Sequence, residues 1–285
     1  MGRVFFDPAT GGYGASGHPE APFRCASSAQ RLAASGHKLE KPIRAASPED
    51  VGLLHSTTHY KNVLSGDFFD ADTPAYPNIA EIARISLSGA LSAAESALGG
   101  ESAFSLMRPP GHHAGKDRVA GFCYFNNLAL SCAHLLKTGK AQRLAILDID
   151  VHHGDGTESL VLGRDSLRFC SLHQSPLYPG TGLESHANCE NIPLSEGTGE
   201  AAYLKELEPA LSRLLDFKPD VLAVSAGFDT YKEDPIAGLK LEKKTYARIG
   251  RLLASTKLKR FAVLEGGYAE DLPALIEQFL DGFFQ

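Results

Sequence analysis

The stretch RLAILDIDVHHGDGT, residues 143–157, decides the fold of this chain. Its first half is apolar and rich in branched side chains, which is typical of a strand buried on both faces of a parallel sheet. In its second half, Asp148, Asp150 and His152 occupy alternate positions. Because successive side chains of an extended chain point to opposite faces, these three point to the same face. Glycines then allow a tight turn. A strand that ends in ionisable groups and a glycine turn predicts a functional site at the carboxyl edge of an open α/β sheet.

A buried ion-pair network is the alternative explanation for these charged groups. We disfavour it, because no Lys or Arg lies within residues 144–157 to neutralise the carboxylates, and a buried unpaired charge is strongly destabilising. A bound cation supplies the compensating charge directly. The stretch therefore predicts a metal site.

The composition is that of a globular intracellular domain. The 285 residues, 43% of them hydrophobic, predict one α/β domain over residues 1–285. The net charge of −6 and the lack of a Lys/Arg-rich run argue against nucleic-acid binding. The N-terminus lacks the apolar core of a signal peptide, and no apolar run approaches the roughly 20 residues of a membrane helix. Five scattered cysteines without a Cys-x-x-Cys pair indicate a reducing compartment, so we expect a cytoplasmic protein without a membrane partner.

Apolar strand patterns alternate with helical patterns along the whole chain. This alternation predicts an α/β fold, with a mostly parallel sheet and helices on both faces. Besides the strand that opens the deciding stretch, we expect strands over 3–6, 103–107, 167–172, 220–225 and 260–264. We expect helices over 27–36, from Ser47, over 79–98, 127–137, 200–217, 241–256 and 271–280.

Several of the predicted strands end in polar side chains that follow Gly or Pro. One strand runs into RPPGHHAG, residues 108–115, which carries His112 and His113. Another is followed by Asp229, and the last by two glycines and Tyr268. Because the carboxyl ends of parallel strands meet at the same edge of a sheet, we expect these groups to converge with the deciding stretch.

The converging residue types suit metal-assisted hydrolysis of an amide or ester. Two aspartates and a histidine, Asp150, His152 and Asp229, leave room for water and substrate, as in catalytic zinc sites, and also suit Fe(II), Mn(II) or Co(II). The two remaining carboxylates match the two remaining histidines, since a carboxylate behind an imidazole fixes its tautomer. Tyr268 offers a hydroxyl to a developing oxyanion.

Five motifs together resemble the histone deacetylase family, which includes bacterial amidohydrolases and acetylpolyamine amidohydrolases. They are RPPGHHA, GFCYFNN, LDIDVHHGDGT, SAGFD and LEGGY, and with GHPEAPFR they extend from Gly17 to Tyr268. The last two are closer to the class II branch than to class I. The resemblance implies the arginase–deacetylase fold, a parallel sheet of about eight strands flanked by helices.

The resemblance also implies roles for the catalytic groups. His113, partnered by Asp155, would be the general base and then the general acid. His112, partnered by Asp148, would act electrostatically, and Tyr268 would polarise the acyl carbonyl.

Two ions are implied by the same resemblance, one Zn²⁺ per chain and a structural K⁺. The zinc ligands would be Asp150, His152 and Asp229. The potassium ligands would be Asp148, the main chain of Asp150 and His152, Ser171 and Leu172.

Substrate contacts follow from the resemblance too. Phe122 and Tyr178 would line a tunnel for the alkyl stem, and the Gly121 carbonyl would face the amide N–H. Arg24 resembles the arginine of the inner acetate channel, and Asp72 stands where the family has a rim aspartate that grips the substrate backbone.

The chain departs from the family pattern in two respects. At 285 residues it is short, so rim loops are expected to be trimmed or supplied by another subunit, and an oligomer is compatible with the sequence. Ile236 stands where one polyamine-selective branch has a glutamate gatekeeper, which argues against a polyamine preference.

The leading interpretation is therefore a zinc-dependent deacylase of acyl-lysine in proteins or peptides. The alternative is an amidohydrolase of acetylpolyamines or other small amides. A catalytically silent binding module would need a missing ligand or base, and none is missing. A binuclear, arginase-like manganese enzyme would need more ligands than the sequence offers.

Overall fold

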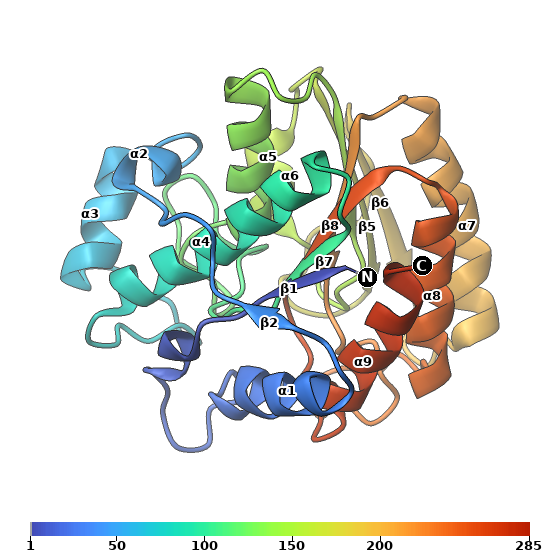
Figure 1. Ribbon diagram of the computed structural model, residues 1–285, viewed down its shortest axis with the longest axis horizontal. Helices are drawn as coiled ribbons and strands as arrows, with labels where there is room; N and C mark the ends of the chain where they lie inside the picture. Colours follow the sequence, from blue (N-terminus) through green and yellow to red (C-terminus); the bar gives the residue numbers. More distant parts are fainter. Residues whose placement is uncertain (1) are drawn as a thin grey trace.

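The strands pair as one parallel sheet, which is seen in a computed structural model that describes residues 2–285 (Figure 1). Within that range the strands are β1 Arg3–Phe5, β2 Leu39–Glu40, β3 Ala103–Ser105, β4 Leu144–Asp148, β5 Leu167–Gln174, β6 Cys189–Leu194, β7 Val221–Ala226 and β8 Lys259–Leu264. Their order in the described sheet is β2-β1-β3-β8-β7-β4-β5-β6, and neighbours are parallel throughout. The predicted fold class and the strand number implied by the resemblance are confirmed.

Helices cover both faces of the sheet (Figure 1). One face carries α1 Phe23–Ala34, α7 Glu200–Asp216, α8 Lys243–Ser255 and α9 Leu272–Phe283. The other carries α2 Pro48–Val51, α3 Thr57–Ser65, α4 Ile79–Leu98, α5 Asn127–Lys137 and α6 Asp155–Val161. A short 3-10 helix, η1 Pro8–Gly11, follows β1.

The strand of the deciding stretch lies in the middle of the molecule, as its apolar run predicts. All five residues of β4 are buried. Ala145 and Leu147 pack into the cluster under α7, α8 and α9, whereas Leu144 and Ile146 pack into the cluster under α4 and α5. A strand covered on both faces needs apolar side chains in both directions, which explains its unbroken hydrophobic run.

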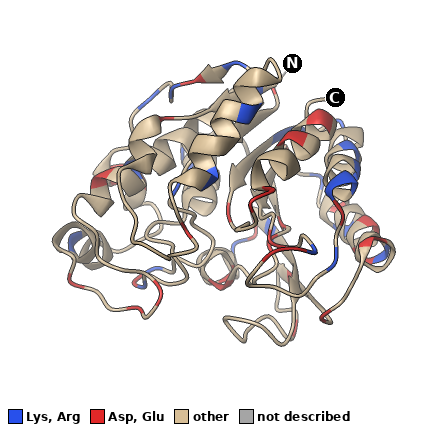
Figure 2. Ribbon diagram, turned by 90° about the horizontal axis from the view of Figure 1, so that it is seen from below, with Lys and Arg blue, Asp and Glu red and all other residues tan. Residues whose placement is uncertain are grey.

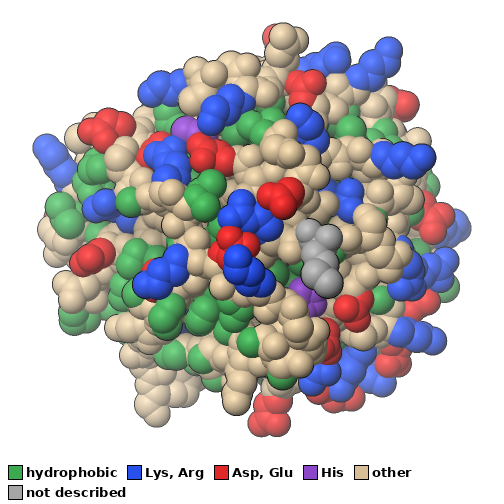
Figure 3. Space-filling view, viewed as in Figure 1, with side chains coloured by type: hydrophobic (Ala, Val, Ile, Leu, Met, Phe, Trp, Pro, Cys, Tyr) green, Lys and Arg blue, Asp and Glu red, His purple; other side chains and the backbone are tan. Residues whose placement is uncertain are grey.

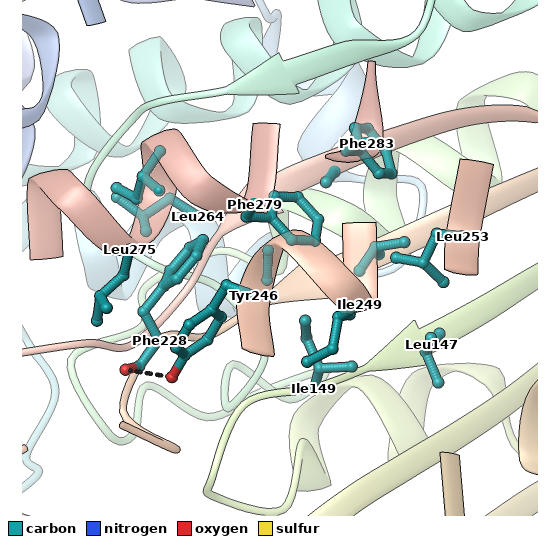
Figure 4. Packing of buried hydrophobic residues seen from close by; sticks show 14 of the residues in the cluster. Leu147, Ile149, Phe228, Tyr246, Ile249, Leu253, Leu264, Leu275, Phe279 and Phe283 are labelled. Atoms are coloured by element: carbon teal, nitrogen blue, oxygen red, sulfur yellow. Dashed lines mark hydrogen bonds between the residues drawn. The ribbon is translucent and has the colours of Figure 1, made fainter. Parts of the chain in front are cut away.

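An aromatic cluster between the sheet, α8 and α9 fixes the loop that follows β7 (Figure 4). The Phe228 ring lies 5.3 Å from the ring of Tyr246 and 5.8 Å from that of Phe279. The Tyr246 hydroxyl donates to the Phe228 carbonyl at 3.0 Å. Because Phe228 directly precedes Asp229, the hydrophobic core sets the position of a predicted metal ligand.

The structure differs from the sequence prediction at the edges of the sheet and at helix starts. The edge strands β2 and β6 were not predicted, because β2 has two residues and β6 carries exposed or half-buried residues along its length. Helix α1 begins at Phe23 rather than near residue 27, and α6 begins at Asp155, where a turn was expected. The helix expected from Ser47 is α2, and Ser47 caps it in a capping box with Asp50.

Charged residues are spread over the helices and loops (Figure 2). On the face shown in Figure 3, Lys and Arg side chains alternate with Asp and Glu. None of the helices in residues 2–285 has the length and apolar character to span a membrane.

Candidate active site

The polar groups predicted at strand ends converge at the carboxyl edge of the sheet. The strands β3, β8, β7 and β4 are neighbours in this order. The RPPGHHAG loop, Tyr268, Asp229 and the polar half of the deciding stretch follow the carboxyl ends of these four strands. Asp148 is the last residue of β4, and its carboxylate accepts a hydrogen bond from the Asp150 N–H at 3.0 Å. The convergence inferred from sequence order is therefore present.

Asp150, His152 and Asp229 form one buried cluster. Their ligand atoms all lie within 4.8 Å of one another. His152 Nδ1 lies 3.1 Å from an Asp150 oxygen and 3.3 Å from Asp229 Oδ2. Among residues 2–285, Asp229 Oδ2 is a buried oxygen with no hydrogen-bond donor. An orphaned carboxylate oxygen beside a second carboxylate and an imidazole is a donor set that fits a divalent cation.

The electrostatics of the cluster point the same way. Burial, followed by repulsion from Asp150, raises the pKa of Asp229 to about 7. Burial alone would lower the pKa of His152, but its contacts with the Asp150 and Asp229 carboxylates outweigh burial and raise that pKa to about 10. The cluster thus holds more negative charge than its protein surroundings compensate, and a cation removes that imbalance.

His112 and His113 each pair with the carboxylate that the family resemblance assigned to them. His112 Nδ1 lies 3.0 Å from Asp148 Oδ2, and His113 Nδ1 lies 2.7 Å from Asp155 Oδ1. Asp155 sits at the first turn of α6, directly beneath the histidine loop. The pairings leave the Nε2 atoms of both rings free of these carboxylates.

The two histidines titrate in opposite directions. Burial acts against protonation of both rings. At His112 the carboxylates of Asp150 and Asp148 outweigh burial and raise its pKa well above the usual range. At His113 burial and the positive charge of His112 lower the pKa to about 3. His113 is the neutral ring, and it is also the one that lines the substrate pocket.

Arg118 is a further member of this group that the sequence analysis missed. Its guanidinium forms an ion pair with Asp155 Oδ2, on the oxygen that His113 does not use. Burial would raise the pKa of Asp155, but the His113 and Arg118 contacts outweigh it and lower that pKa to about 2. A lone arginine in a loop gives no sequence signal for such a role, because the pairing spans 37 residues.

A pocket of about 310 Å³ opens above the cluster. Its lining includes His113, His152 and Tyr268. The five residues that the resemblance assigned to substrate binding also line it: Asp72, Gly121, Phe122, Tyr178 and Ile236. The Tyr178 ring meets His113 edge-on at 5.1 Å, and the Phe122 ring meets Tyr268 edge-on at 5.9 Å. Apolar and aromatic side chains of this kind suit the alkyl part of a small ligand.

The pocket wall requires an unusual backbone at Gly121 and Phe122. Gly121 has a φ of +53°, and a Cβ there would lie 2.4 Å from the His113 ring, so only glycine fits. Phe122 has a φ of 69°, and its N–H donates to the buried Thr73 hydroxyl at 2.8 Å. That hydroxyl donates in turn to Asp70 at 2.7 Å. Thr73, which the sequence analysis missed, thus links the acidic rim to the pocket wall.

Arg24 lies behind the pocket and is fully buried. Its guanidinium donates to the Gly267 carbonyl at 2.7 Å, pairs with Glu20 at 3.1 Å and lies 4.8 Å from the centre of the Tyr268 ring. Arg108 shares the same Glu20. Two buried arginines on one carboxylate leave a net positive charge behind Tyr268; the acetate-channel role of Arg24 stays a prediction.

Glu265 is another buried carboxylate that the sequence analysis did not single out. It accepts hydrogen bonds from the main-chain N–H groups of Gly111 and His112, at 2.7 and 3.1 Å, and from the Ser225 hydroxyl at 3.2 Å. Burial is the main cause that raises its pKa to about 7. Glu265 therefore ties the histidine loop to β7 and β8.

Two of the residues predicted to hold potassium, Asp148 and Ser171, lie side by side on β4 and β5. Asp148 pairs with Ser171 across the two strands, and both are fully buried. The Ser171 hydroxyl lies 2.9 Å from His173 Nδ1. The potassium site itself stays a prediction.

The sheet and the cluster at its carboxyl edge are those of the arginase–deacetylase class of α/β proteins. The chain belongs to the histone deacetylase family, since the family described as "Histone deacetylase domain" matches residues 18–282. The family and several relatives are named for deacetylase or acetylpolyamine amidohydrolase activity.

Named relatives come from both archaea and bacteria. The chain is 40% identical over 235 residues to a "Probable deacetylase" of Methanothermobacter thermautotrophicus, covering 77% of this chain and 71% of the relative. It is 39% identical over 239 residues to "Acetylpolyamine amidohydrolase 1" of Pseudomonas aeruginosa, covering 80% of this chain and 66% of the relative. A crystal structure of acetylpolyamine aminohydrolase from Burkholderia pseudomallei matches with a TM-score of 0.93 at 27% identity, over 99% of this chain and 98% of that one.

Proposed function

We propose that this protein is a zinc-dependent amidohydrolase that removes the acetyl group from small N-acetylated amines, with acetylpolyamines as the leading class. The observation that carries the proposal is a single pocket that brings together His152 of the metal cluster, His113 and Tyr268 beneath an aspartate, Asp72, at its rim. The names of the relatives favour small acetylated amines over acyl-lysine proteins. This reverses the order of the two substrate classes inferred from the sequence.

Asp150, His152 and Asp229 would hold the metal. When bound, the ion would polarise the amide carbonyl as a Lewis acid and lower the pKa of a water molecule. Two carboxylates, one imidazole and an open position suit zinc, although the same set also accepts Fe(II), Mn(II) or Co(II). Asp148, Ser171 and the main chain around them are proposed to hold a structural K⁺, and residues 1–285 are proposed to act as one deacetylase domain.

His113 is proposed to move the proton. Asp155 occupies its Nδ1, which leaves Nε2 toward the pocket. A neutral imidazole there accepts a proton from the attacking water and returns it to the nitrogen of the leaving amine. His112, held charged by Asp148 and Asp150, contributes positive charge beside the reacting carbonyl.

Tyr268 is proposed to stabilise the oxyanion. Burial raises the pKa of its hydroxyl well above the usual range, so the phenol stays protonated and can donate a hydrogen bond. The hydroxyl would meet the carbonyl oxygen from the wall of the pocket as negative charge develops there.

The rim is proposed to select the amine. Ile236 supplies no charge for a second ammonium group, but Asp72 lines the pocket mouth, and Asp70 lies next to it on the same loop. An alkyl chain between Phe122 and Tyr178 would carry the distal ammonium of an acetylated diamine toward these carboxylates. Acyl-lysine peptides are the second candidate, because an exposed Asp72 also suits peptide N–H groups.

The test compares substrates on zinc-loaded protein. We expect a larger kcat/KM for N-acetylputrescine and N-acetylspermidine than for an acetyl-lysine peptide, and loss of both activities after treatment with a chelator. A preference for the peptide would restore the acyl-lysine interpretation. Activity that is unaffected by complete metal removal would contradict the metal-dependent mechanism.

A further inference from the structure

Asp234 is a buried carboxylate that joins two loops of the pocket. Its side chain is 6% exposed and lies on the loop between β7 and α8. Oδ2 accepts a hydrogen bond from the Tyr268 main-chain N–H at 2.8 Å, and Oδ1 accepts one from the Ile236 N–H at 3.1 Å. Tyr268 and Ile236 both line the substrate pocket but come from different strand ends. One carboxylate therefore holds two walls of the same pocket.

The loop that presents Asp234 is itself tightly fixed. The Asp234 N–H donates to the Tyr231 carbonyl at 3.0 Å, and Tyr231 forms a parallel bridge with Leu241. The Tyr231 hydroxyl also contacts Asp271 at 3.0 Å. The same loop also carries Asp229 of the metal cluster. Asp234 thus sits on a rigid segment with a defined position relative to the metal ligands.

The loop that carries Tyr268 is less constrained by its own sequence. Two glycines precede Tyr268, and Gly267 has a φ of +116°, in a region where glycine is free to vary. This loop is held from outside: Gly266 N–H donates to Asp150 at 2.7 Å, and Arg24 binds the Gly267 carbonyl. The Tyr268 N–H is held by Asp234. Among these anchors, Asp234 holds the main chain of the residue that bears the phenol, whereas Arg24 lies over the face of its ring.

The Asp234 carboxylate has no ion-pair partner among residues 2–285, and its acceptor oxygens are used by these two main-chain N–H groups. Burying a carboxylate without a cationic partner is unfavourable unless several donors compensate it. An asparagine would fill the same space at a smaller electrostatic cost. The charge and the two equivalent acceptor oxygens are what an amide or a hydroxyl lacks here.

We propose that Asp234 is a positioning residue that fixes the Tyr268 phenol relative to the metal cluster by tying its main chain to the loop of Asp229 and Ile236. The inference rests on the proposed function, because it concerns the residue that would stabilise the oxyanion.

The test is a double-mutant cycle between Asp234→Asn and Tyr268→Phe. Asparagine keeps the shape but turns an N–H₂ group toward one of the two main-chain donors. We expect kcat for N-acetylputrescine to fall at least about tenfold with KM within about threefold, since small displacements of a catalytic group cost up to roughly a hundredfold. In a Tyr268→Phe background the same change should cost less than about twofold, because the hydroxyl that Asp234 positions is already gone.

Asp220 provides the matched control. Its Oδ2 also accepts two main-chain N–H hydrogen bonds, from Gln142 and Arg143 at 2.7 and 2.9 Å, but ahead of β4 at the opposite edge of the sheet. Asp220→Asn should leave kcat within about twofold of the wild type. Metal content and Tm are measured for every variant, and Asp234→Glu, which keeps the charge but moves it outward, replaces Asp234→Asn if the latter does not fold.

Each outcome decides the inference. Equal losses from Asp234→Asn in the wild-type and Tyr268→Phe backgrounds would overturn it, as would wild-type kcat in Asp234→Asn. Loss of metal or failure of both Asp234 variants to fold would assign Asp234 to the fold instead. A metal-loaded wild type that is inactive on acetylated amines and on acetyl-lysine peptides would overturn the proposed function, and this inference with it.

Discussion

The rings of His112 and His113 lie 4.0 Å apart between centroids, yet their pKa values move in opposite directions. Positive charge on both of two imidazoles so close together is unfavourable because the charges repel. Each ring also contacts its own carboxylate. His112 lies beside two carboxylates, Asp148 and Asp150, so it takes the charge. His113 remains neutral and faces the pocket, which gives the two adjacent residues different functions.

The first prediction follows from this division. His113→Ala removes the group that would accept and return the proton, a contribution of about a hundred- to ten-thousandfold in kcat. His112→Ala removes only positive charge and should cost less. Steady-state kinetics of both variants, with metal content measured alongside, distinguish the roles. Loss of metal from both variants would show that the histidines are ligands.

The metal cluster yields the second prediction. Asp229→Asn halves the negative charge of the two carboxylates that would hold the ion. It also removes the anionic character of Oδ2, a buried oxygen that accepts no hydrogen bond from residues 2–285. We expect the purified variant to bind less than one divalent ion per chain and to lose activity. Asp70→Asn, at the rim, serves as the control that keeps full metal. Full zinc stoichiometry in Asp229→Asn would remove Asp229 from the ligand set.

The acidic rim leads to the third prediction. Asp72→Asn removes a charge at the pocket mouth, and exposed ion pairs contribute up to about 1 kcal/mol. KM for N-acetylputrescine should therefore rise by roughly two- to fivefold. KM for N-butylacetamide, which has the same alkyl length and no ammonium group, should not change. An equal rise in KM for both substrates would mean that Asp72 shapes the rim but does not bind the ammonium group.

The pH dependence of stability can be tested at His55, away from the pocket. Burial, followed by the neighbouring His59, lowers the pKa of His55 to about 3. The neutral ring donates from Nδ1 to the Gly115 carbonyl and accepts at Nε2 from the Asn126 main-chain N–H. In the unfolded chain its pKa returns to about 6.5. His55 therefore contributes stability that is fully present above pH 6.5 and is lost as the pH falls toward 3.

His55→Gln should flatten this dependence. The slope of the unfolding free energy against pH reports how many more protons the unfolded state binds than the folded state. Between about pH 6 and 4 this number should be smaller in His55→Gln than in the wild type, by up to about one proton. Urea unfolding of metal-free protein across that range measures it. A slope that is unchanged in His55→Gln would show that the folded ring is already protonated there.

Much of the site was accessible from sequence because parallel strands deliver their following residues to one edge. The ends of β3, β4, β7 and β8 each carry a short polar motif, and the strand order makes them neighbours. The buried run of β4 and the glycines after it are local signals. The assignment of His113 to Asp155 and of His112 to Asp148 rested on the family resemblance, and the structure shows the same pairs.

What the sequence missed depends on contacts between distant segments. Thr73 meets Phe122 across 49 residues, Glu265 meets Gly111 across 154, and Asp234 meets Tyr268 across 34. A single threonine or aspartate in a loop is typical of a turn or a solvated surface. The sequence around it therefore does not predict a contact with a distant segment. The edge strand β6 escaped for a similar reason, because half-exposed residues interrupt its apolar pattern.

The last prediction concerns Tyr268 alone. Tyr268→Phe keeps the ring that packs edge-on against Phe122 and beneath Arg24, and removes only the hydroxyl. Folding and metal content should therefore be unchanged. Loss of one oxyanion donor typically costs about a hundred- to a thousandfold in kcat, or roughly 3–4 kcal/mol. KM should change little, because the metal and the aromatic walls hold the ground-state amide.

The opposing possibility is a tyrosine whose only task is packing. Its ring is 9% exposed and its N–H is held by Asp234, so a structural role alone would make the hydroxyl dispensable. In that case Tyr268→Phe would stay within about threefold of the wild type, a difference of less than about 1 kcal/mol. Such a result would leave the metal and His112 as the groups that balance the oxyanion charge. A drop in kcat at constant KM instead places the phenol at the reacting carbonyl, since an interaction made mainly in the transition state appears in kcat.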